Sequence, residues 1–483
     1  MGNIGQAQGE GRNISNALLI FAGLLLVALA FGFNGWMVGN QATYAASNTP
    51  TGPAMARLED KDMRSFQRVY QLLMKEYVTE PDSAALIEGA IQGMIEALND
   101  PRSHYYNAEQ MSVQSDQSQG AYTGIGSSVQ SSSGRIVLVY VYPNSPAEKA
   151  GLINGDMLVS IDGIDAIGMP LDEAVARVRG ARGTTVTLVI ERAGVDDPFE
   201  VVVTRDVVET ITVQGTMLEE GIGMIQISSF TNTTGPQFGR ELQKLLEEGM
   251  QGLILDLRNN GGGTLDGLMD VANMLVPEGT VFTWIFRDGV PLDEVSTLQR
   301  RDFEVVVLMN SFSASASEVL AGALQDTGAG KLVGVRSFGK GSAQHTYPLD
   351  NGGGVSLTAS KWLTPNGKHI EGLGLEPDVK VHDPYDPLSV EKNVAIKPGQ
   401  IELLQAKLQA LGYEAPFEAQ IGESTAAALR AFQVDNQLYV SGSLSDDTIR
   451  VLNIQCYERI PHESDPQLET GVAELKTMIA AAD

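Results

Sequence analysis

The chain has 483 residues, 33 basic and 60 acidic side chains, a net charge of −27 and one cysteine. At about 150 residues per domain, this length predicts roughly three domains. A surface this acidic repels phosphate backbones, which argues against nucleic acid as a partner. The lone Cys456 excludes an intramolecular disulfide and a zinc site built from cysteines. No HExxH motif or other clustered metal-ligand spacing occurs, so we expect no cofactor.

The N-terminal region contains an apolar segment. Residues 17–33 carry no charged side chain, and extension to Val38 gives the roughly 20 residues that a spanning helix needs. Arg12 precedes this segment and no Lys or Arg follows until Arg57, which places the body outside the cytoplasm. We therefore predict a single-pass protein of the cell membrane with a cytoplasmic N-terminus at 1–16, a transmembrane anchor at 17–38 and a linker at 39–60. A cleaved signal peptide and a secreted protein are the alternative.

Two amphipathic helices follow the linker. Apolar side chains at three-to-four spacing predict one helix over 61–77 and another over 83–98, with Asp82 as the N-cap of the second. We place a helical arm at 61–118 and expect it to cap the core or to pair two copies into a homodimer.

Short β-rich runs and two short helices between about 121 and 192 predict a small, partly open barrel whose edge accepts a peptide. The runs TGIG at 123–126, NSPAEKAGL at 144–152 and NGDMLVSIDG at 154–163 resemble a PDZ domain, which we place at 119–194. The backbone N–H groups of the TGIG turn would converge on the terminal carboxylate of a peptide. The residues of this turn are Thr123, Gly124, Ile125 and Gly126. Taken alone, TGIG is equally compatible with a tight turn that binds nothing.

From about 221 to 378 strands and helices alternate, which predicts α/β layers. A strand ending at Met309 is followed by small hydroxyl residues and then by a helix. A serine at this junction lies near a helix N-terminus, where N–H groups can stabilise an oxyanion. Lys340, between Gly339 and Gly341, ends a later strand. It can act as a general base only if burial lowers its pKa from about 10.4 to about 7–8.

Three other interpretations of these residues remain. The spacing from Gly334 to Lys340 matches a phosphate loop, but Gly341 replaces the Ser or Thr that would hold Mg²⁺, and no helix follows. A Ser-His-Asp arrangement could use His345 or another of the five histidines. The serines could also be simple helix caps, with Lys340 on the surface.

Three motifs together carry a closer resemblance: LDLRNNGGG at 255–263, NSFSASASEVLAGALQD at 310–326 and SFGKGSAQ at 337–344. They are similar to those of the C-terminal (tail-specific) processing peptidases. The resemblance implies a crotonase-like α/β protease core, which we place at 195–385, and a Ser/Lys dyad assisted by Gln.

Carried onto this sequence, the resemblance makes Ser315 the nucleophile, Lys340 the base and Gln344 the partner that orients the lysine. Ser313 and Ser317 are the alternative nucleophiles. The implied oxyanion donors are the backbone N–H of Ala316 and that of Gly261 or Gly262.

After Pro398 three short amphipathic helices, at 401–413, 424–438 and 444–453, predict a helical bundle over 396–455. Its LQ, LGY, FQ and DDTIRVL segments resemble a peptidoglycan-binding domain, which implies peptidoglycan as a partner. The usual Asp-Gly is replaced here by residues 418–422, EAQIG, so a spacer bundle is the alternative. Residues 456–483 are predicted to form an exposed tail.

The sequence therefore predicts a multidomain α/β protein with one membrane anchor. Its predicted function is that of a membrane-tethered extracytoplasmic serine endopeptidase whose PDZ domain binds peptide substrates with free C-termini. The alternative is a non-catalytic envelope scaffold that binds peptides and cell wall.

Overall fold

The computed structural model describes residues 36–37, 59–219, 221–390, 396, 398–418, 420–459 and 465–482. The described residues form two compact units, of which the smaller is Ser112–Ile211. The predicted anchor at 17–38 lies outside the described residues, except for Trp36–Met37, which form the short strand β1. The predicted cytoplasmic segment and most of the linker also lie outside them. No helix in the described part of the chain is both long and apolar enough to cross a bilayer.

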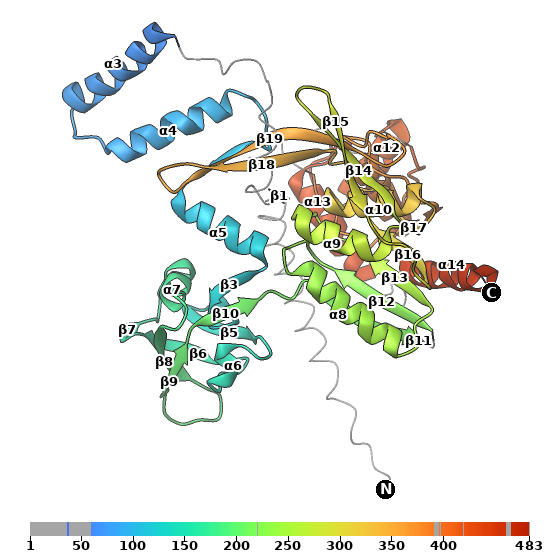
Figure 1. Ribbon diagram of the computed structural model, residues 1–483, viewed down its shortest axis with the longest axis horizontal. Helices are drawn as coiled ribbons and strands as arrows, with labels where there is room; N and C mark the ends of the chain where they lie inside the picture. Colours follow the sequence, from blue (N-terminus) through green and yellow to red (C-terminus); the bar gives the residue numbers. More distant parts are fainter. Residues whose placement is uncertain are drawn as a thin grey trace. The chain divides into compact units, whose positions relative to one another are not determined.

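A six-stranded sheet forms the centre of the larger unit (Figure 1). In spatial order its strands are β11 (Val213–Glu219), β12 (Ile222–Ile227), β13 (Gly252–Asp256), β16 (Glu304–Met309), β17 (Lys331–Gly334) and β20 (Val379–Lys380). Only β11 is antiparallel to its neighbour. This parallel pattern is the α/β layering that the sequence predicts.

Helices cover both faces of this sheet. Side chains of α8 (Thr234–Glu247), α9 (Leu265–Leu275) and α10 (Ala316–Asp326) share a core with Leu253 and Leu255. Ile254 points to the other face, where it packs with Leu475 of α14 (Pro466–Ala482). Because both faces are covered, β13 is buried at every position.

Helix α14 corrects the prediction of an exposed tail at 456–483. Leu475 is fully buried, and α14 contacts β13, β16 and β17. Its apolar side chains close a sheet face that would otherwise be open to water, so this segment is part of the core.

The larger unit also contains a second sheet. Its main path is β1, β18 (Ser342–Pro348), β19 (Gly354–Leu363), β14 (Gly279–Phe286) and β15 (Pro291–Ser296). Strand β2 (His104–Tyr106) pairs with β19, with His104 opposite Ser356. This pairing brings the end of the helical arm to the strands that follow Lys340.

The arm begins with α3 (Asp60–Glu76) and α4 (Ser83–Glu96), close to the predicted helices. The Asp82 side chain accepts from the backbone N–H groups of Ala84 and Ala85, which confirms the predicted N-cap. Beyond these helices, the structure adds β2 and α5 (Ala108–Gln119).

The smaller unit contains a sheet of β4 (Ser127–Ser132), β5 (Arg135–Val141), β6 (Met157–Ile161), β8 (Thr185–Glu191) and β9 (Phe199–Thr204), with β7 (Ile164–Asp165) beside β6. It also contains α6 (Pro146–Lys149), α7 (Leu171–Val178) and a pair formed by β3 (Ala121–Gly124) and β10 (Asp206–Glu209). Because β9 pairs with β8 and β10 pairs with β3, this unit extends beyond residue 194, where the sequence placed its end.

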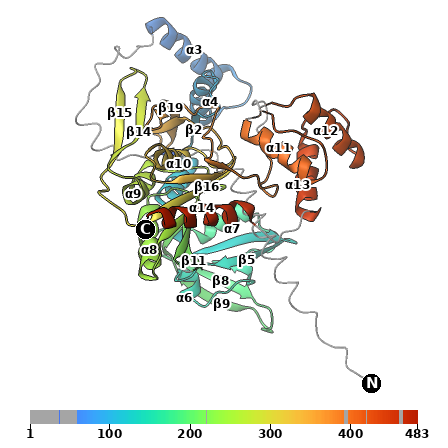
Figure 2. The ribbon, with the colours of Figure 1, turned by 90° about the vertical axis from the view of Figure 1, so that its right-hand side faces the viewer.

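The C-terminal bundle consists of α11 (Pro398–Ala410), α12 (Glu423–Asp435) and α13 (Asp446–Arg459) (Figure 2). Leu404, Leu429, Phe432 and Leu452 pack together in its core. Leu388, from the segment before α11, joins the same cluster and so connects the bundle to the chain that leaves the sheet.

Candidate active site

Ser315 lies at the junction between β16 and α10, where it is the N-cap of the helix. Its φ of 56° and ψ of −117° form a backbone conformation that non-glycine residues rarely adopt. Such strain costs about 1–3 kcal/mol and is concentrated at functional sites. A strained serine between a strand and a helix is the arrangement of a nucleophile that the fold holds in position.

The neighbouring serines are engaged elsewhere. Ser313 Oγ donates to the Leu257 carbonyl at 2.8 Å, and Ser317 Oγ donates to the Asn260 carbonyl at 2.9 Å. Ser315 Oγ donates to no acceptor in the described part of the chain. Of the three candidates, Ser315 is therefore the serine whose proton is available for transfer.

A buried carboxylate, Glu318, joins the backbone of Ser315 to that of Lys340. Its Oε2 accepts from the Ser315 N–H at 2.9 Å and from the Lys340 N–H at 2.8 Å. Its Oε1 accepts from the Ser337 hydroxyl and the Gly339 N–H. Burial raises the pKa of Glu318, although these four hydrogen bonds oppose the rise. A single side chain therefore holds both candidate catalytic residues at their main-chain atoms.

Lys340 is almost fully buried, with 3% of its surface exposed, so the structure does not support a surface lysine. The Lys340 carbonyl accepts from Trp362 Nε1 at 3.1 Å. Gly339 has a φ of +83°, and an added Cβ would lie 2.7 Å from the Gly374 backbone nitrogen. Only glycine fits there, which explains the residue type on that side of the lysine.

Gln344 is buried on β18, and its amide Nε2 donates to Thr358 Oγ1 at 3.1 Å. Burial raises the pKa of Asp100, but hydrogen bonds from Ser103 and Thr358 outweigh this effect and bring it below its ordinary value. The hydroxyl of Thr358 therefore connects the Gln344 amide to a carboxylate of the arm. Because the Gln344 amide nitrogen faces Thr358, its carbonyl oxygen faces away from Thr358.

Other residues at the end of the arm also support the turn around Lys340. Arg102 pairs with Glu371 at 2.8 Å, and Glu371 accepts from the Gly341 N–H at 2.9 Å. Burial lowers the pKa of His104 and the nearby Lys340 charge lowers it further, whereas Asp100 raises it. Residues more than 200 positions apart thus build one site.

The glycine turn after β13 lies against Ser315. An added Cβ on Gly262, whose φ is +102°, would come 2.8 Å from Ser315 Cβ and 2.9 Å from Ala316 N. The Gly262 N–H itself donates to Asn260 Oδ1. By contrast, the N–H groups of Gly261 and Ala316 donate to no acceptor in the described ranges.

Two alternative interpretations do not fit the geometry. His345 follows Gln344 on a strand, so its side chain points to the opposite face. There it lies beside Trp284 and Phe286, with Nε2 3.5 Å from Ser360 Oγ, and burial lowers its pKa. The strand β18 begins directly after Gly341, where a phosphate loop would continue as a helix.

The predicted carboxylate-binding turn lies in the smaller unit. The Ile125 carbonyl accepts from the Ala147 N–H at 2.7 Å, and the Gly126 carbonyl accepts from the Tyr142 N–H at 3.0 Å. These bonds orient the turn while the N–H groups of Ile125 and Gly126 find no acceptor among the described residues. The buried hydroxyl of Ser127, next in the chain, also lacks a hydrogen-bond partner there. Unused donors at this turn are what an anion-binding site requires.

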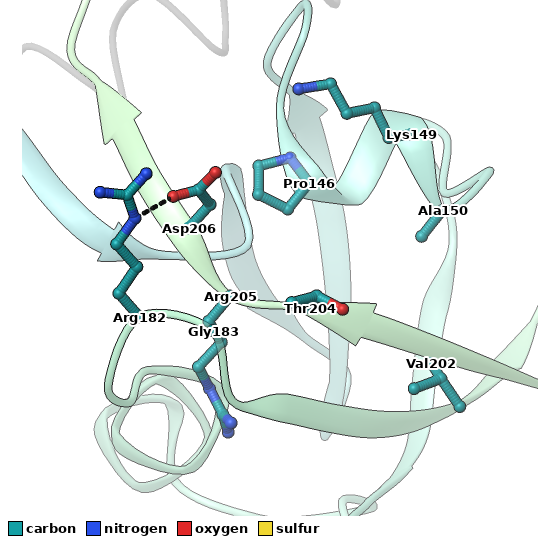
Figure 3. Close-up of a pocket in the computed structure, with 9 residues that line it drawn as sticks. All are labelled: Pro146, Lys149, Ala150, Arg182, Gly183, Val202, Thr204, Arg205 and Asp206. Carbon is teal, nitrogen blue, oxygen red and sulfur yellow. Dashed lines mark hydrogen bonds and ion pairs between the residues drawn. The ribbon is translucent and has the colours of Figure 1, made fainter.

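A cavity of about 450 Å³ lies elsewhere in the smaller unit, between α6 and the end of β9 (Figure 3). It is lined by Lys149 and by the ion pair of Arg182 and Asp206, among other residues. It includes no residue of the TGIG turn. Within the described ranges, no group of three or more His, Cys, Asp or Glu side chains could hold a metal ion.

Sequence reasoning missed Glu318, Asp100 and Arg102. The first carried a signal, because Ser315 and Glu318 have the S-x-x-E spacing of a capping box. The other two carried none, since they reach the site only through the pairing of β2 with β19.

An α/β core with a strained serine and a buried lysine held by one carboxylate, in a chain that also has a PDZ-like unit, has the features of a serine-type peptidase. Comparison with known families agrees. Residues 221–381 match peptidase family S41, 137–192 a PDZ domain, 397–452 a putative peptidoglycan binding domain, and 25–110 the N-terminal domain of activating protease CtpB.

Relatives match over nearly the whole chain. The carboxy-terminal processing proteases CtpA and CtpB of Bacillus subtilis (strain 168) are 31% and 33% identical, covering 95% and 94% of this chain and 98% of each relative. Among solved structures, a photosystem II D1 C-terminal processing protease is 30% identical over 68% of this chain and 89% of its own, with a TM-score of 0.40. The chain belongs to peptidase family S41 and is a C-terminal processing serine protease with a PDZ domain.

Proposed function

We propose that this protease cleaves peptides with a Ser315/Lys340 dyad. The observation that carries this proposal is the Glu318 carboxylate, which binds the main chain of both residues through one oxygen. The strained backbone of Ser315 and the burial of Lys340 support the same assignment. Neither feature is needed in a non-catalytic scaffold, which is the alternative class.

In the first step, neutral Lys340 takes the proton of Ser315 Oγ as this oxygen attacks the scissile carbonyl carbon. The N–H groups of Ala316 and Gly261 stabilise the oxyanion. Gly261 is preferred over Gly262 because the latter's N–H is already donated to Asn260. The C–N bond then breaks, and the Lys340 ammonium protonates the leaving amine. A water molecule hydrolyses the acyl-enzyme, giving one proton to Lys340, which returns a proton to Ser315.

Gln344 orients the lysine in this mechanism. Because its Nε2 donates to Thr358, its carbonyl oxygen is the end that can accept from the Lys340 ammonium. An amide acceptor adds no negative charge, so it leaves the lysine able to lose its proton.

The PDZ unit supplies substrate recognition. The unused N–H groups of Ile125 and Gly126 are suited to the terminal carboxylate of a substrate, and an extended peptide can pair with the adjacent strand β4. We assign the whole turn, Thr123–Gly126, to this role.

The setting of the protein is also part of the proposal. The apolar stretch at 17–38 would anchor the chain as a single span with its body outside the cytoplasm. The match of residues 397–452 to a peptidoglycan-binding domain makes peptidoglycan the proposed second partner. The exposed apolar side chains of α3, which has no buried residue, favour pairing of two arms in a homodimer.

The test of the dyad is cleavage of a disordered peptide that ends in apolar residues. Ser315→Ala and Lys340→Ala should each lower kcat/KM by about 10³-fold or more, whereas Ser317→Ala, the matched control, should retain most activity. The wild-type rate should rise with pH as Lys340 loses its proton. Equal cleavage by the wild type and both dyad variants would exclude the dyad as the catalytic group. A wild type that cleaves nothing would favour the alternative, a non-catalytic scaffold.

A further inference from the structure

The C-terminal bundle directly contacts the loop that carries Ser315. Gln400 Nε2, on α11, donates to Ser311 Oγ at 2.9 Å, and both side chains are buried. Beside it, an added Cβ on Gly399 would lie 2.8 Å from the Arg336 carbonyl oxygen. Every residue from Gly399 to Leu408 is buried, so α11 is covered on all sides. One side of the helix faces its own bundle and another faces the protease core.

A second buried contact comes from the segment before the bundle. Asp386 Oδ1 accepts from Asn310 Nδ2 at 2.8 Å, and only 7% of Asp386 is exposed. Asn310 is the last residue before the loop with the three serines. The other Asp386 oxygen, Oδ2, has no hydrogen-bond partner among the described residues.

Asn310 links this contact to the glycine turn as well. Its Nδ2 also donates to Asn259 Oδ1, and its Oδ1 accepts from the backbone N–H groups of Asn259 and Phe312. Asn259 stands two residues before Gly261. Asp386 therefore holds a side chain that joins both loops of the site.

Charged side chains around the same interface hold the bundle in place. Glu402 accepts from Lys380 at 3.2 Å, and Lys407 Nζ donates to the Pro384 carbonyl at 2.6 Å. A domain that served only as a wall tether would need no buried hydrogen bonds to catalytic loops, because domains within a chain move relative to one another unless their interface holds them together.

We propose that the C-terminal bundle, together with the segment that leads into it, braces the catalytic loops. Gln400 and Asp386 act as positioning residues, the first through Ser311 and the second through Asn310, on the loop of Ser315 and on the glycine turn. This inference rests on the proposed dyad and adds that a domain resembling a wall-binding module is a working part of the protease. Small displacements of catalytic groups are costly, since rates depend on sub-ångström alignment.

Helix α11 provides a matched pair of buried glutamines for the test. Gln400 donates to Ser311 in the loop that carries Ser315 and also accepts from the Ser389 N–H. Gln405 bonds within the bundle, donating to Thr425 Oγ1 and accepting from the Glu418 N–H. In the full chain, Gln400→Ala should lower kcat about tenfold with KM within about twofold. Gln405→Ala should lower the melting temperature but leave kcat within about twofold.

Asp386 provides an independent test of the proposal. Asp386→Ala should lower kcat like Gln400→Ala, and Asp386→Asn, which keeps the oxygen that accepts from Asn310, should restore most of it. Gln400→Ala and Ser311→Ala should be non-additive in kcat, since each removes the same hydrogen bond.

The brace is overturned if Gln405→Ala lowers kcat as much as Gln400→Ala, because the effect would then be one of folding alone. It is equally overturned if Gln400→Ala and Asp386→Ala both leave kcat unchanged, or if the Gln400/Ser311 pair is additive. An error in the proposed dyad would give a different result from an error in the brace. If the dyad were wrong, Ser315→Ala would cleave the peptide as fast as the wild type.

Discussion

At the scale of single residues, Glu318 is the side chain on which the site most depends. It is fully buried, and it accepts from Ser315, Ser337, Gly339 and Lys340. Burying a carboxylate without hydrogen-bond donors would be strongly unfavourable. The four donors around Glu318 therefore stabilise it in its buried position. Its function in the proposed mechanism is to position the dyad; it takes no part in proton transfer.

We expect Glu318→Ala to lower kcat by about 10²-fold, because four donors lose their acceptor and the main chain at Ser315 and Lys340 relaxes. Glu318→Gln keeps one acceptor oxygen and should lose less. Steady-state kinetics on the peptide substrate measure both. Glu423→Gln, an exposed acid in the first turn of α12, is the control and should behave as the wild type. Wild-type kinetics in Glu318→Ala would contradict the positioning role.

At the scale of elements, the nucleophile depends on how two loops meet. The turn after β13 approaches the N-terminus of α10 so closely that Gly262 leaves no room for a side chain beside Ser315. The glycines of NNGGG therefore serve close approach as well as backbone freedom. The approach also brings the unused N–H of Gly261 to the same end of the sheet as that of Ala316.

Gly262→Ala should abolish most activity. The new Cβ would lie 2.8 Å from Ser315 Cβ and 2.9 Å from Ala316 N, so one of these atoms would have to move. We expect kcat to fall by about 10²-fold or more. The matched control is Gly289→Ala, which has a positive φ of 73° but no neighbour within 4 Å of the added carbon. It should cost about 1 kcal/mol of stability and leave kcat unchanged. Equal kinetics in the two variants would refute a steric role for Gly262.

At the scale of the whole molecule, buried charge at the bundle interface should make stability depend on pH. Burial raises the pKa of Asp386 to about 7, and Asp383 raises it further, while Asn310, Arg258 and Lys407 oppose the rise. In the unfolded chain the same carboxyl has an ordinary pKa near 3.8. The folded state therefore favours the protonated acid, and this contribution is full below pH 4 and lost as pH rises through 7.

Wild type should accordingly lose stability relative to Asp386→Asn between pH 5 and pH 8.5, because the amide cannot ionise. One pKa unit corresponds to about 1.4 kcal/mol, so the difference should reach a few kcal/mol. Urea unfolding at several pH values measures it. The exposed Asp350→Asn is the control and should track the wild type at every pH. A difference between wild type and Asp386→Asn that stays constant with pH would contradict the assignment.

The arm yields a prediction at the same scale. Phe66 and Val69 are among the exposed apolar side chains of α3. If two arms pair, Phe66→Asp with Val69→Asp should convert a dimer to a monomer, as measured by sedimentation. Gln67→Asp, which adds charge to a polar position of the same helix, should leave the dimer intact. A wild-type chain that sediments as a monomer at all concentrations would rule out this pairing.

Local pattern determined much of the architecture. The strands around β12, β13 and β16, the helix at 265–275 and the N-cap at Asp82 follow from spacing and from residue type, and the structure contains them. The motifs with Ser315, Lys340 and Gln344 could be identified for the same reason, because each lies within one short run. The end of the PDZ unit and the fate of the last helix could not, since both depend on pairing with distant strands.

By itself, then, the sequence determined the class of protein through its resemblance to a known family, and the same resemblance predicted the residues of the candidate dyad. Only the tertiary structure decided what holds them. Arg102 reaches Ser342 across 240 residues, and Asp386 reaches Asn310 across 76. Such contacts leave no periodic trace, because a hydrogen bond between distant segments depends on how the sheets, the arm and the bundle pack. This is why the support of the site, and the proposed use of the C-terminal bundle as its brace, became visible only in the fold.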